Sequence, residues 1–269
     1  MIPRVVHQIW IGSTPPPTSL IASWQRFCAS RRWTHRLWND EKHPLFDAVR
    51  GVLDAMPTVG DRAELMRYVI LESEGGVYAD ADTVLIRPLD DNLLMRDFCT
   101  FEHELVRPGS FASNVMGFER SSPVMRHCID VLSSHSVGSP SKRGTALLTE
   151  AITLNHLRAQ SGAKLRDVRA LSARHFNPVH WSGAPAPGLN RPRNGRADPA
   201  IYAAHRWHTA ARQCDEAHAT PTSISQAHVI AMAEKIFGID DESLSSAVSK
   251  NREPPSAESS IALTASARL

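Results

Sequence analysis

Two carboxylates stand close together in the segment GGVYADADTVL, residues 75–85. Asp80 and Asp82 are separated by one residue, and alternate residues of an extended strand point to the same face. Two negative charges on one face repel each other unless a positive group lies between them. A hard divalent cation, Mg²⁺ or Mn²⁺, is the commonest partner of such a pair. The spacing therefore favours a metal site just after a glycine turn.

The segment before this motif predicts the element that leads into it. Residues 61–74, DRAELMRYVILESE, carry apolar side chains at helical spacing behind an acidic start, and Gly75 supplies the stop signal. Glu64 and Arg67 are three residues apart on this predicted helix, so they share one face. They form either a surface ion pair or part of a ligand site beside the metal.

The rest of the chain alternates between strand and helix patterns. Strands are expected at 4–12, 35–40, 98–103, 113–119 and 201–208, and helices at 19–29 and 122–135. Such alternation predicts an α/β fold with a mostly parallel central sheet and helices on both faces. The stretch 182–199 is rich in proline, glycine and arginine, so we expect a loop, and long loops inside compact domains are often functional.

Composition and charge indicate an ordinary globular protein. Of the 269 residues, 42% are hydrophobic and 22% are charged, which is enough to bury a substantial core. Thirty Lys and Arg against 28 Asp and Glu leave a net charge of +2, so no overall field favours nucleic acid. We expect a single domain over 1–240 and a serine-rich, largely disordered tail over 241–269.

Cysteine spacing and the N-terminus bear on the compartment. Four scattered cysteines without a C-x-x-C pair disfavour a zinc site and a disulfide framework. The chain enters a strand pattern at once, which leaves no room for a signal peptide, and no apolar run approaches the roughly 20 residues of a membrane span. We therefore expect a cytoplasmic protein, acting there, at the cytoplasmic face of a membrane, or after export without a signal peptide.

Two stretches together resemble a known family. HQIWIG near the N-terminus, followed by RAELMRYVILESEGGVYADADTVLIRPLD, resembles the DXD-motif glycosyltransferases, which include initiating mannosyltransferases, bacterial capsular-polysaccharide transferases and, more distantly, the clostridial glucosylating toxins. The likeness is dense over residues 3–90 and looser beyond them. It implies a GT-A type fold and a metal-dependent, retaining transfer of a hexose. The implied donor is a nucleotide-diphosphate sugar such as a UDP- or GDP-sugar, and the acceptor a glycan, a lipid-linked molecule or a protein.

The resemblance implies metal ligands. Asp82 would hold the metal, and Asp80 would assist through the metal's water shell or the ribose hydroxyls. His205 is the counterpart of a late side chain that completes the coordination in similar proteins, and His208 is a second candidate. An imidazole suits Mn²⁺ better than Mg²⁺. On residue type alone, a structural histidine is the alternative for His205.

The resemblance also assigns residues to the donor. Trp10 would stack on the base, although a core tryptophan is equally consistent with its residue type. Arg67 would bind donor hydroxyls or phosphate, and Tyr78 would lie along the nucleotide. Asn114 matches a family position near the sugar. Glu64 stands where relatives usually carry aspartate, and its extra methylene would affect the choice of sugar.

Two departures from the family pattern concern the region after Asn114. Gly144 and Thr145 fall where relatives have a Gly-Pro turn, but Ala146 replaces the proline. Ala210 and Ala211 occupy the place of a late Ser-Trp pair that would cover the diphosphate. This second change raises the possibility of weakened activity.

Two other functional classes fit parts of the motif. DADTV also fits the nucleophile loop of haloacid-dehalogenase-like phosphohydrolases, in which the first aspartate is phosphorylated, but that loop follows an extended apolar strand rather than Gly-Gly. A non-catalytic sugar-nucleotide-binding protein is the other alternative. Hydrolysis assays on nucleotide sugars and on simple phosphoesters distinguish the three.

Overall fold

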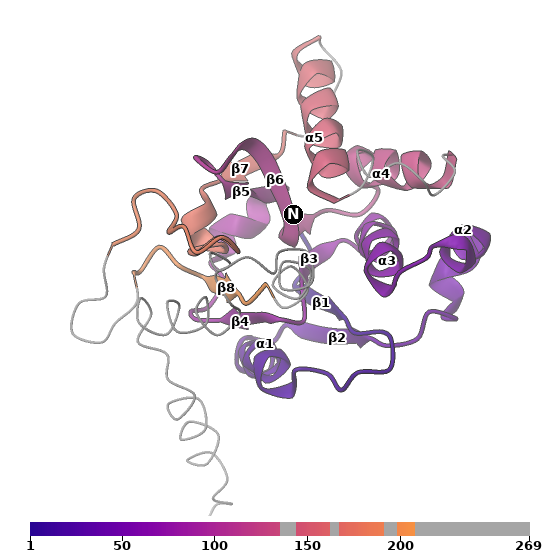
Figure 1. Ribbon diagram of the computed structural model, residues 1–269, viewed down its shortest axis with the longest axis horizontal. Coiled ribbons are helices and arrows are strands. Elements are labelled where there is room, and N and C mark those ends of the chain that lie inside the picture. Colours follow the sequence, from indigo (N-terminus) through magenta and orange to yellow (C-terminus); the bar gives the residue numbers. More distant parts are fainter. Residues whose placement is uncertain (135–143, 162–166, 191–197, 208–269) are drawn as a thin grey trace, which may run out of the picture. The chain divides into compact units, whose positions relative to one another are not determined.

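The centre of the computed structural model is a six-stranded sheet (Figure 1). The structure describes residues 1–134, 144–161, 167–190 and 198–207. The sheet has the strand order β2-β1-β3-β6-β5-β7. Its strands are β1 (Val5–Ile9), β2 (Thr34–Trp38), β3 (Gly76–Ala79), β5 (Phe98–His103), β6 (Arg107–Phe118) and β7 (Arg169–Leu171). Only β6 runs antiparallel to its neighbours, so the expected α/β architecture with a mostly parallel sheet is confirmed.

A separate two-stranded sheet joins distant parts of the chain. β4 (Thr83–Leu85) pairs antiparallel with β8 (Ala203–His205), and Thr83 lies opposite His205 in the register. The predicted strand at 201–208 thus exists as a shorter element, and its pairing with the segment after the DXD motif was not predicted. This pairing brings the late histidine to the aspartates.

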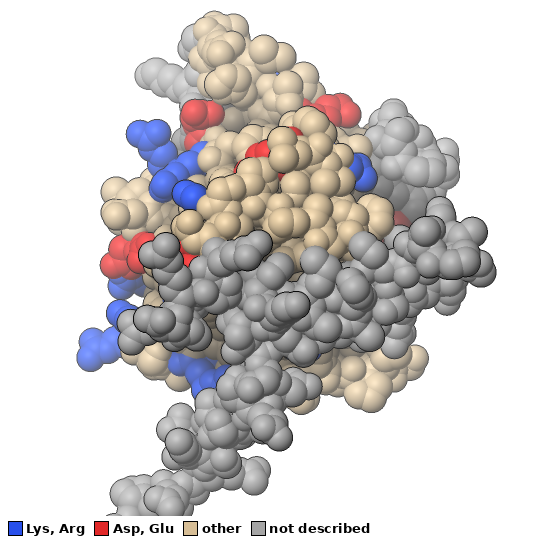
Figure 2. All heavy atoms as spheres, turned by 60° about the vertical axis from the view of Figure 1, so that its left-hand side comes forward, with Lys and Arg blue, Asp and Glu red and all other residues tan. Residues whose placement is uncertain are grey.

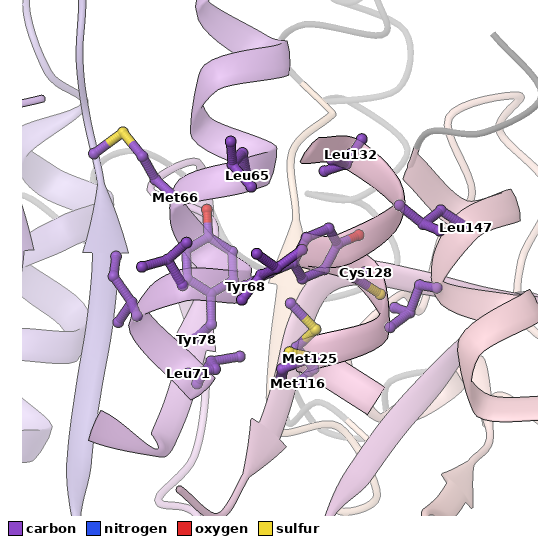
Figure 3. Close-up of a cluster of buried hydrophobic side chains, with 14 of the residues drawn as sticks. Leu65, Met66, Tyr68, Leu71, Tyr78, Met116, Met125, Cys128, Leu132 and Leu147 are labelled. Atoms are coloured by element: carbon purple, nitrogen blue, oxygen red, sulfur yellow. The ribbon is translucent and has the colours of Figure 1, made fainter. Parts of the chain in front are cut away.

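Helices cover both faces of the central sheet. They are α1 (Thr18–Arg31), α2 (Arg50–Ala55), α3 (Val59–Glu74), α4 (Pro123–Ser134) and α5 (Gly144–Gln160), with short 3-10 turns η1 (Pro44–Val49), η2 (Asp91–Met95) and η4 (Ala173–His175). Neighbouring residues of β3 point to opposite sides: Val77 joins a core with Trp24 of α1, whereas Tyr78 joins a core with α3, α4 and α5. Figure 3 shows the second of these cores, and the prediction of helices on both faces is confirmed.

The turn from α3 into β3 requires its two glycines. Gly75 and Gly76 have φ values of 64° and 114°. A Cβ on Gly76 would lie 2.8 Å from the carbonyl oxygen of Val5 and 2.9 Å from His7 Nε2, and a Cβ on Gly75 would lie 2.8 Å from the amide nitrogen of Arg120. No larger residue fits either place without movement of the backbone or of His7. The glycine pair therefore lets β3 lie close to β1 directly before the aspartates.

His7 is a buried structural histidine that contacts this turn. Its Nδ1 accepts a hydrogen bond from the indole nitrogen of Trp38 at 3.2 Å, and its Nε2 lies 2.9 Å from the carbonyl oxygen of Gly75. Both contacts are satisfied when the ring is neutral and carries its proton on Nε2. Burial lowers the pKa of His7 from 6.5 to about 4.

This pKa predicts a pH dependence of folding. Between pH 6.5 and pH 4 the unfolded chain binds the proton and the folded chain does not, so the contribution of His7 to stability is complete above pH 6.5 and is lost as the pH falls toward 4. The loss amounts to about 3 kcal/mol of unfolding free energy. Urea unfolding at pH 7 and pH 4.5 should show a smaller difference in His7→Gln than in the unchanged protein. An identical pH dependence in both would contradict this role of His7.

Several expectations fall outside the described residues. These are the disordered tail at 241–269, the second metal candidate His208, and the two alanines at 210 and 211. Within the described part of 182–199, the structure has no helix and one isolated bridge, between Val179 and Pro185, in agreement with a loop. Cys28, Cys99 and Cys128 are buried and free.

Two surface features concern partners. No described helix is both long and apolar enough to cross a membrane. On the face in Figure 2, basic and acidic side chains are interspersed among the described residues, which agrees with the small net charge.

Candidate metal and donor site

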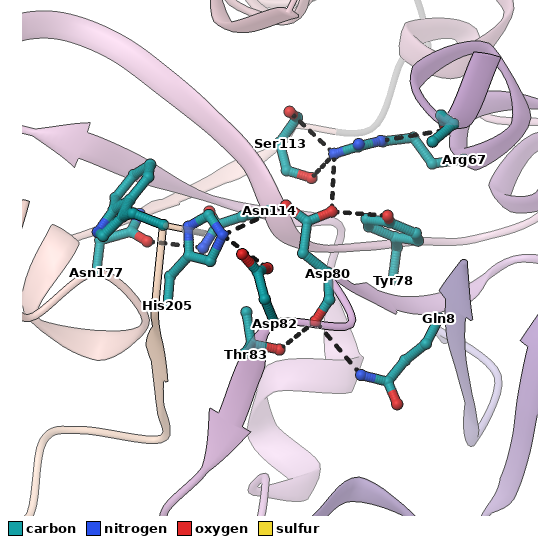
Figure 4. A network of polar contacts seen from close by, with 12 residues as sticks. Gln8, Arg67, Tyr78, Asp80, Asp82, Thr83, Ser113, Asn114, Asn177 and His205 are labelled. Atoms are coloured by element: carbon teal, nitrogen blue, oxygen red, sulfur yellow. Dashed lines mark hydrogen bonds and ion pairs between the residues drawn. The ribbon is translucent and has the colours of Figure 1, made fainter. Parts of the chain in front are cut away.

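The DXD motif lies in a turn between two strands. β3 ends at Ala79 and β4 begins at Thr83, so the prediction that one extended strand presents both carboxylates is wrong. The amide and the hydroxyl of Thr83 both donate to the carbonyl oxygen of Asp80, at 3.0 and 2.6 Å, and Gln8 Nε2 donates to the same oxygen at 3.3 Å (Figure 4). The turn directs the side chains of Asp80 and Asp82 toward a common point.

His205 completes a cluster with the two aspartates. Its Nε2 lies 2.9 Å from Asp82 Oδ1 and 3.7 Å from Asp80 Oδ2. One ligand atom from each of the three residues can be chosen so that all lie within 4.8 Å of one another. The register of β4 and β8 explains this convergence, because His205 sits directly opposite the residue after Asp82.

The pKa values of Asp80 and His205 are both shifted upward. Burial raises the pKa of Asp80, and the nearby charges of Arg67 and His205 offset this only in part. Burial acts to lower the pKa of His205, but the carboxylates of Asp82 and Asp80 outweigh it, so the pKa is raised above 6.5. The shift of His205 shows the negative potential that Asp80 and Asp82 create at its ring.

These residues fit a divalent metal ion. Two carboxylates and one imidazole form a mixed oxygen and nitrogen donor set, which suits Mn²⁺ better than Mg²⁺ because Mg²⁺ prefers oxygen ligands. A cation would also offset the negative charge of the two aspartates. The donor chemistry and the electrostatics therefore agree.

Arg67 and Tyr78 both contact Oδ1 of Asp80. Arg67 Nη1 lies 3.2 Å from Asp80 Oδ1 and donates to the carbonyl oxygen of Ser113 at 2.9 Å. The Tyr78 hydroxyl donates to the same Asp80 oxygen at 2.7 Å, and the Arg67 guanidinium lies 4.7 Å from the centre of the Tyr78 ring. Tyr78 is only 1% exposed, so the structure shows it as a support of the carboxylate. A contact of Tyr78 with the nucleotide stays a prediction.

Glu64 makes its hydrogen bonds with Tyr68 and Gly144. Its Oε1 accepts hydrogen bonds from the Tyr68 hydroxyl at 3.2 Å and from the amide of Gly144, the first residue of α5. Burial raises the pKa of Glu64, and the charge of Arg67 and these two hydrogen bonds oppose the rise. Arg67 thus pairs with Asp80, while Glu64 satisfies an amide at a helix N-terminus.

The remaining donor candidates lie at the same end of the sheet. Trp10 directly follows β1, is half-buried, and donates from its indole nitrogen to the carbonyl oxygen of Thr14 at 2.8 Å. Its partial exposure argues against a purely core tryptophan. The carbonyl oxygen of Asn114 accepts from the Asp80 amide at 2.7 Å, which places Asn114 beside the motif.

Reasoning from the sequence missed Gln8 and Thr83, which hold the DXD turn, and three further site residues. Ser113 holds Arg67, Asn177 contacts Asn114, and the Trp207 ring lies 4.2 Å from the His205 ring. Ser113 and Trp207 are close in sequence to predicted residues, and this proximity was a usable signal. Asn177 lies in no motif, so nothing in the sequence marked it.

A known family matches one part of the chain. Residues 19–99 match the family described as the glycosyltransferase sugar-binding region containing the DXD motif. Residues 19–99 are thus similar to the DXD glycosyltransferase region. This region includes Glu64, Arg67 and both aspartates, whereas Trp10, Asn114 and His205 lie outside the matched residues.

Two relatives share parts of their sequence with the chain. Inositol phosphoceramide mannosyltransferase 3 of Schizosaccharomyces pombe is 30% identical over 131 residues, which cover 46% of this chain and 35% of that protein. The uncharacterized glycosyltransferase L373 of Acanthamoeba polyphaga mimivirus is 23% identical over 164 residues, which cover 57% of this chain and 65% of that protein. The chain thus spans about a third of the first relative and less than two thirds of the second.

Solved structures of glycosyltransferases are also similar to this chain. PaToxG glycosyltransferase is 15% identical with a TM-score of 0.45, covering 60% of this chain and 75% of that one. A glycosyltransferase involved in glycosylation of the major capsid of PBCV-1 is 10% identical with a TM-score of 0.38, covering 62% of this chain and 82% of that one.

Proposed function

We propose that the chain is a metal-dependent, retaining hexosyltransferase that uses a nucleotide-diphosphate sugar. The observation that supports this most is the convergence of Asp80, Asp82 and His205 within 4.8 Å at the DXD motif of the matched region. The proposed donor is a UDP- or GDP-sugar. The proposed acceptor is a hydroxyl of a glycan, a lipid-linked molecule or a protein, as in polysaccharide biosynthesis.

In this proposal the three residues hold Mn²⁺, or Mg²⁺, with Asp82 as the principal ligand and His208 as a further candidate. When bound, the metal neutralises the charge of the departing diphosphate and so makes it a better leaving group. Arg67 and the Tyr78 hydroxyl fix Asp80 in place through their contacts with Oδ1. Glu64, Tyr78 and Asn114 are the further proposed donor-binding residues, and Arg67 is proposed to bind donor hydroxyls or phosphate with its remaining N–H groups.

The proposal is tested with purified protein and a panel of UDP-, GDP- and ADP-sugars, with and without Mn²⁺. Release of free nucleotide that depends on Mn²⁺ supports transferase chemistry. Hydrolysis of p-nitrophenyl phosphate without turnover of any nucleotide sugar would support the phosphohydrolase alternative. Donor binding without turnover, seen as a rise in melting temperature, would support the non-catalytic alternative.

A prediction for Trp10 follows from its place at the end of β1. If its ring stacks on the donor base, Trp10→Ala should weaken donor binding by about 1 to 3 kcal/mol, the usual range for base stacking on aromatic rings. Calorimetric titration with the active nucleotide measures this change. Trp33→Ala is a suitable control, because Trp33 is a buried core tryptophan and should lower the melting temperature with little effect on donor affinity. Unchanged affinity in Trp10→Ala would refute the stacking role.

A second prediction concerns stereochemistry. An inverting transferase needs a carboxylate base on the face opposite the leaving group. The acids assigned to the site are engaged elsewhere: Asp80 with Arg67, Asp82 with His205, and Glu64 with Gly144. We therefore expect front-face transfer, in which the departing phosphate accepts the proton of the acceptor, and an α-linked product from an α-configured donor. Proton NMR of the anomeric signal early in the reaction checks this, and a β-linked first product would contradict it.

A further inference from the structure

Asn114 and Asn177 form a buried amide pair beside the DXD turn. Asn114 Nδ2 donates to Asn177 Oδ1 at 2.7 Å, and the two side chains appear in the same polar network as the aspartates and His205 (Figure 4). Asn177 is fully buried and Asn114 is 4% exposed. Neither amide is therefore free to exchange its partners with bulk water.

The orientation of the pair follows from one carbonyl group. Asn177 Nδ2 donates to the backbone carbonyl oxygen of Phe101 at 3.2 Å. A carbonyl oxygen only accepts hydrogen bonds, so the nitrogen of the Asn177 amide must face Phe101 and its oxygen must face Asn114. The Asn114 amide must then turn its nitrogen toward Asn177, because two oxygens at 2.7 Å would repel each other.

This chain of contacts leaves one oxygen of Asn114 for another partner. Asn114 Oδ1 is buried and has no hydrogen-bond partner among the residues that the structure describes. A buried acceptor without a partner costs free energy, and a ligand that donates to it removes that cost. Asn114 is also next to the motif, since its own carbonyl oxygen accepts from the Asp80 amide at 2.7 Å.

The local strand geometry separates Asn114 from the regular ladder. The register of β5 and β6 pairs Cys99 with Met116 but Thr100 with Ala112, so residues 113–115 bulge out between them. Bulges next to active sites commonly redirect side chains. Here the bulge supplies both the carbonyl oxygen that holds Arg67 and the amide that meets Asn177.

We infer that Asn177 is a positioning residue that fixes the Asn114 amide with its oxygen toward the donor, so that the site accepts a hydrogen bond from one hydroxyl of the transferred sugar. This inference rests on the proposed function. It requires a hydrogen-bond donor at that place and so excludes recognition of a phosphate oxygen or another acceptor there. Because Asn114 Oδ1 is closed to solvent, binding of the sugar must include a small local movement that opens a path to it.

The experiment uses UDP-glucose, UDP-galactose and GDP-mannose, with the deoxy and deoxyfluoro analogues of each at C2, C3, C4 and C6, and measures dissociation constants in the presence of Mn²⁺. Fluorine retains weak acceptor character but has no hydrogen to donate. For one hydroxyl, both replacements should weaken binding to the unchanged protein equally, by about 5- to 150-fold. Asn114→Ala should abolish this penalty, and Asn177→Ala should reduce it because the Asn114 amide can then rotate.

Controls separate this inference from folding and from the proposed function. Asn155→Ala removes a buried asparagine of α5 and should keep the full discrimination between hydroxyl and fluorine. Asn177→Ser serves if Asn177→Ala does not fold, and the comparison in the unchanged protein needs no variant. Failure of every nucleotide sugar to bind the unchanged protein would refute the proposed function. Three results would overturn this inference alone, provided that the unchanged protein binds a nucleotide sugar. The fluoro analogue could bind about as tightly as the parent sugar, or no hydroxyl replacement could weaken binding. The folded Asn177 variant could also keep the full difference in affinity between the hydroxyl and the fluoro sugar.

Discussion

Replacing Asp82 with asparagine should lower the rate of sugar transfer by about a hundred- to a thousandfold, which corresponds to roughly 3 to 4 kcal/mol for one well-placed electrostatic group. Asparagine keeps the size of the side chain but removes the charge that holds a cation. Asp82 is the closest acid to His205 Nε2, at 2.9 Å, so the change removes one of three groups in the cluster. Initial rates with the active donor and saturating Mn²⁺ measure the effect.

The fold of Asp82→Asn should remain intact. Circular dichroism and the melting temperature should stay close to those of the unchanged protein, while the rise in melting temperature caused by donor and Mn²⁺ together should disappear. Asp54→Asn, which changes an exposed acid on α2, is the matched control and should transfer sugar normally. Near-normal turnover by Asp82→Asn would rule out Asp82 as the principal metal ligand.

Arg67→Met should destabilise the fold by about 3 to 5 kcal/mol, because it leaves the carboxylate of Asp80 without its buried partner. The side chains of Arg67 and Asp80 are 11% and 21% exposed, so water compensates little for the loss. The loss of stability has an upper bound, because Asp80 can take up a proton and become neutral. Protonating a carboxyl whose pKa is ordinary in the unfolded chain costs roughly 4 kcal/mol at pH 7. Urea unfolding measures the change.

A double variant distinguishes this electrostatic cause from lost packing. In Arg67→Met with Asp80→Asn the uncompensated charge is gone, so the double variant should be more stable than Arg67→Met alone. Arg67 also donates to Ser113, and that loss should persist in both proteins. Simple addition of the two single effects would show that the charge of Asp80 is not what makes Arg67 important for stability.

The sequence predicted the convergence of Asp80 and Asp82 for a reason that was partly wrong. Asp80 and Asp82 do converge, but through a turn held by Thr83 and Gln8 and not through alternation along a strand. The helix before them was predicted at 61–74 and observed at Val59–Glu74, because its apolar spacing and its glycine stop are local signals. The glycine pair is visible in the sequence, but the reason that glycine is required depends on Val5 and His7, which pack against Gly76 in the folded chain.

Long-range pairings set the limit of prediction from the sequence. The pairing of β4 with β8 places His205 against Asp82, and no local pattern encodes the register of two short strands so far apart in the chain. Asn177 is a similar case, since its importance depends on the carbonyl of Phe101 and the amide of Asn114 meeting it in space. Glu64 was assigned to the donor by resemblance, and that role stays a prediction; the structure adds that its carboxylate accepts from the first amide of α5.

Titration of Mn²⁺ into the protein, followed by electron paramagnetic resonance of the free ion, tests whether the cluster of Asp80, Asp82 and His205 binds a metal for donor recognition. The unchanged protein should bind one equivalent of Mn²⁺, more tightly when UDP or GDP is present, and Asp82→Asn and His205→Ala should each weaken that binding. Mn²⁺ binding that is the same in the unchanged protein and in both variants, or that does not respond to either nucleotide, would contradict the proposed metal site.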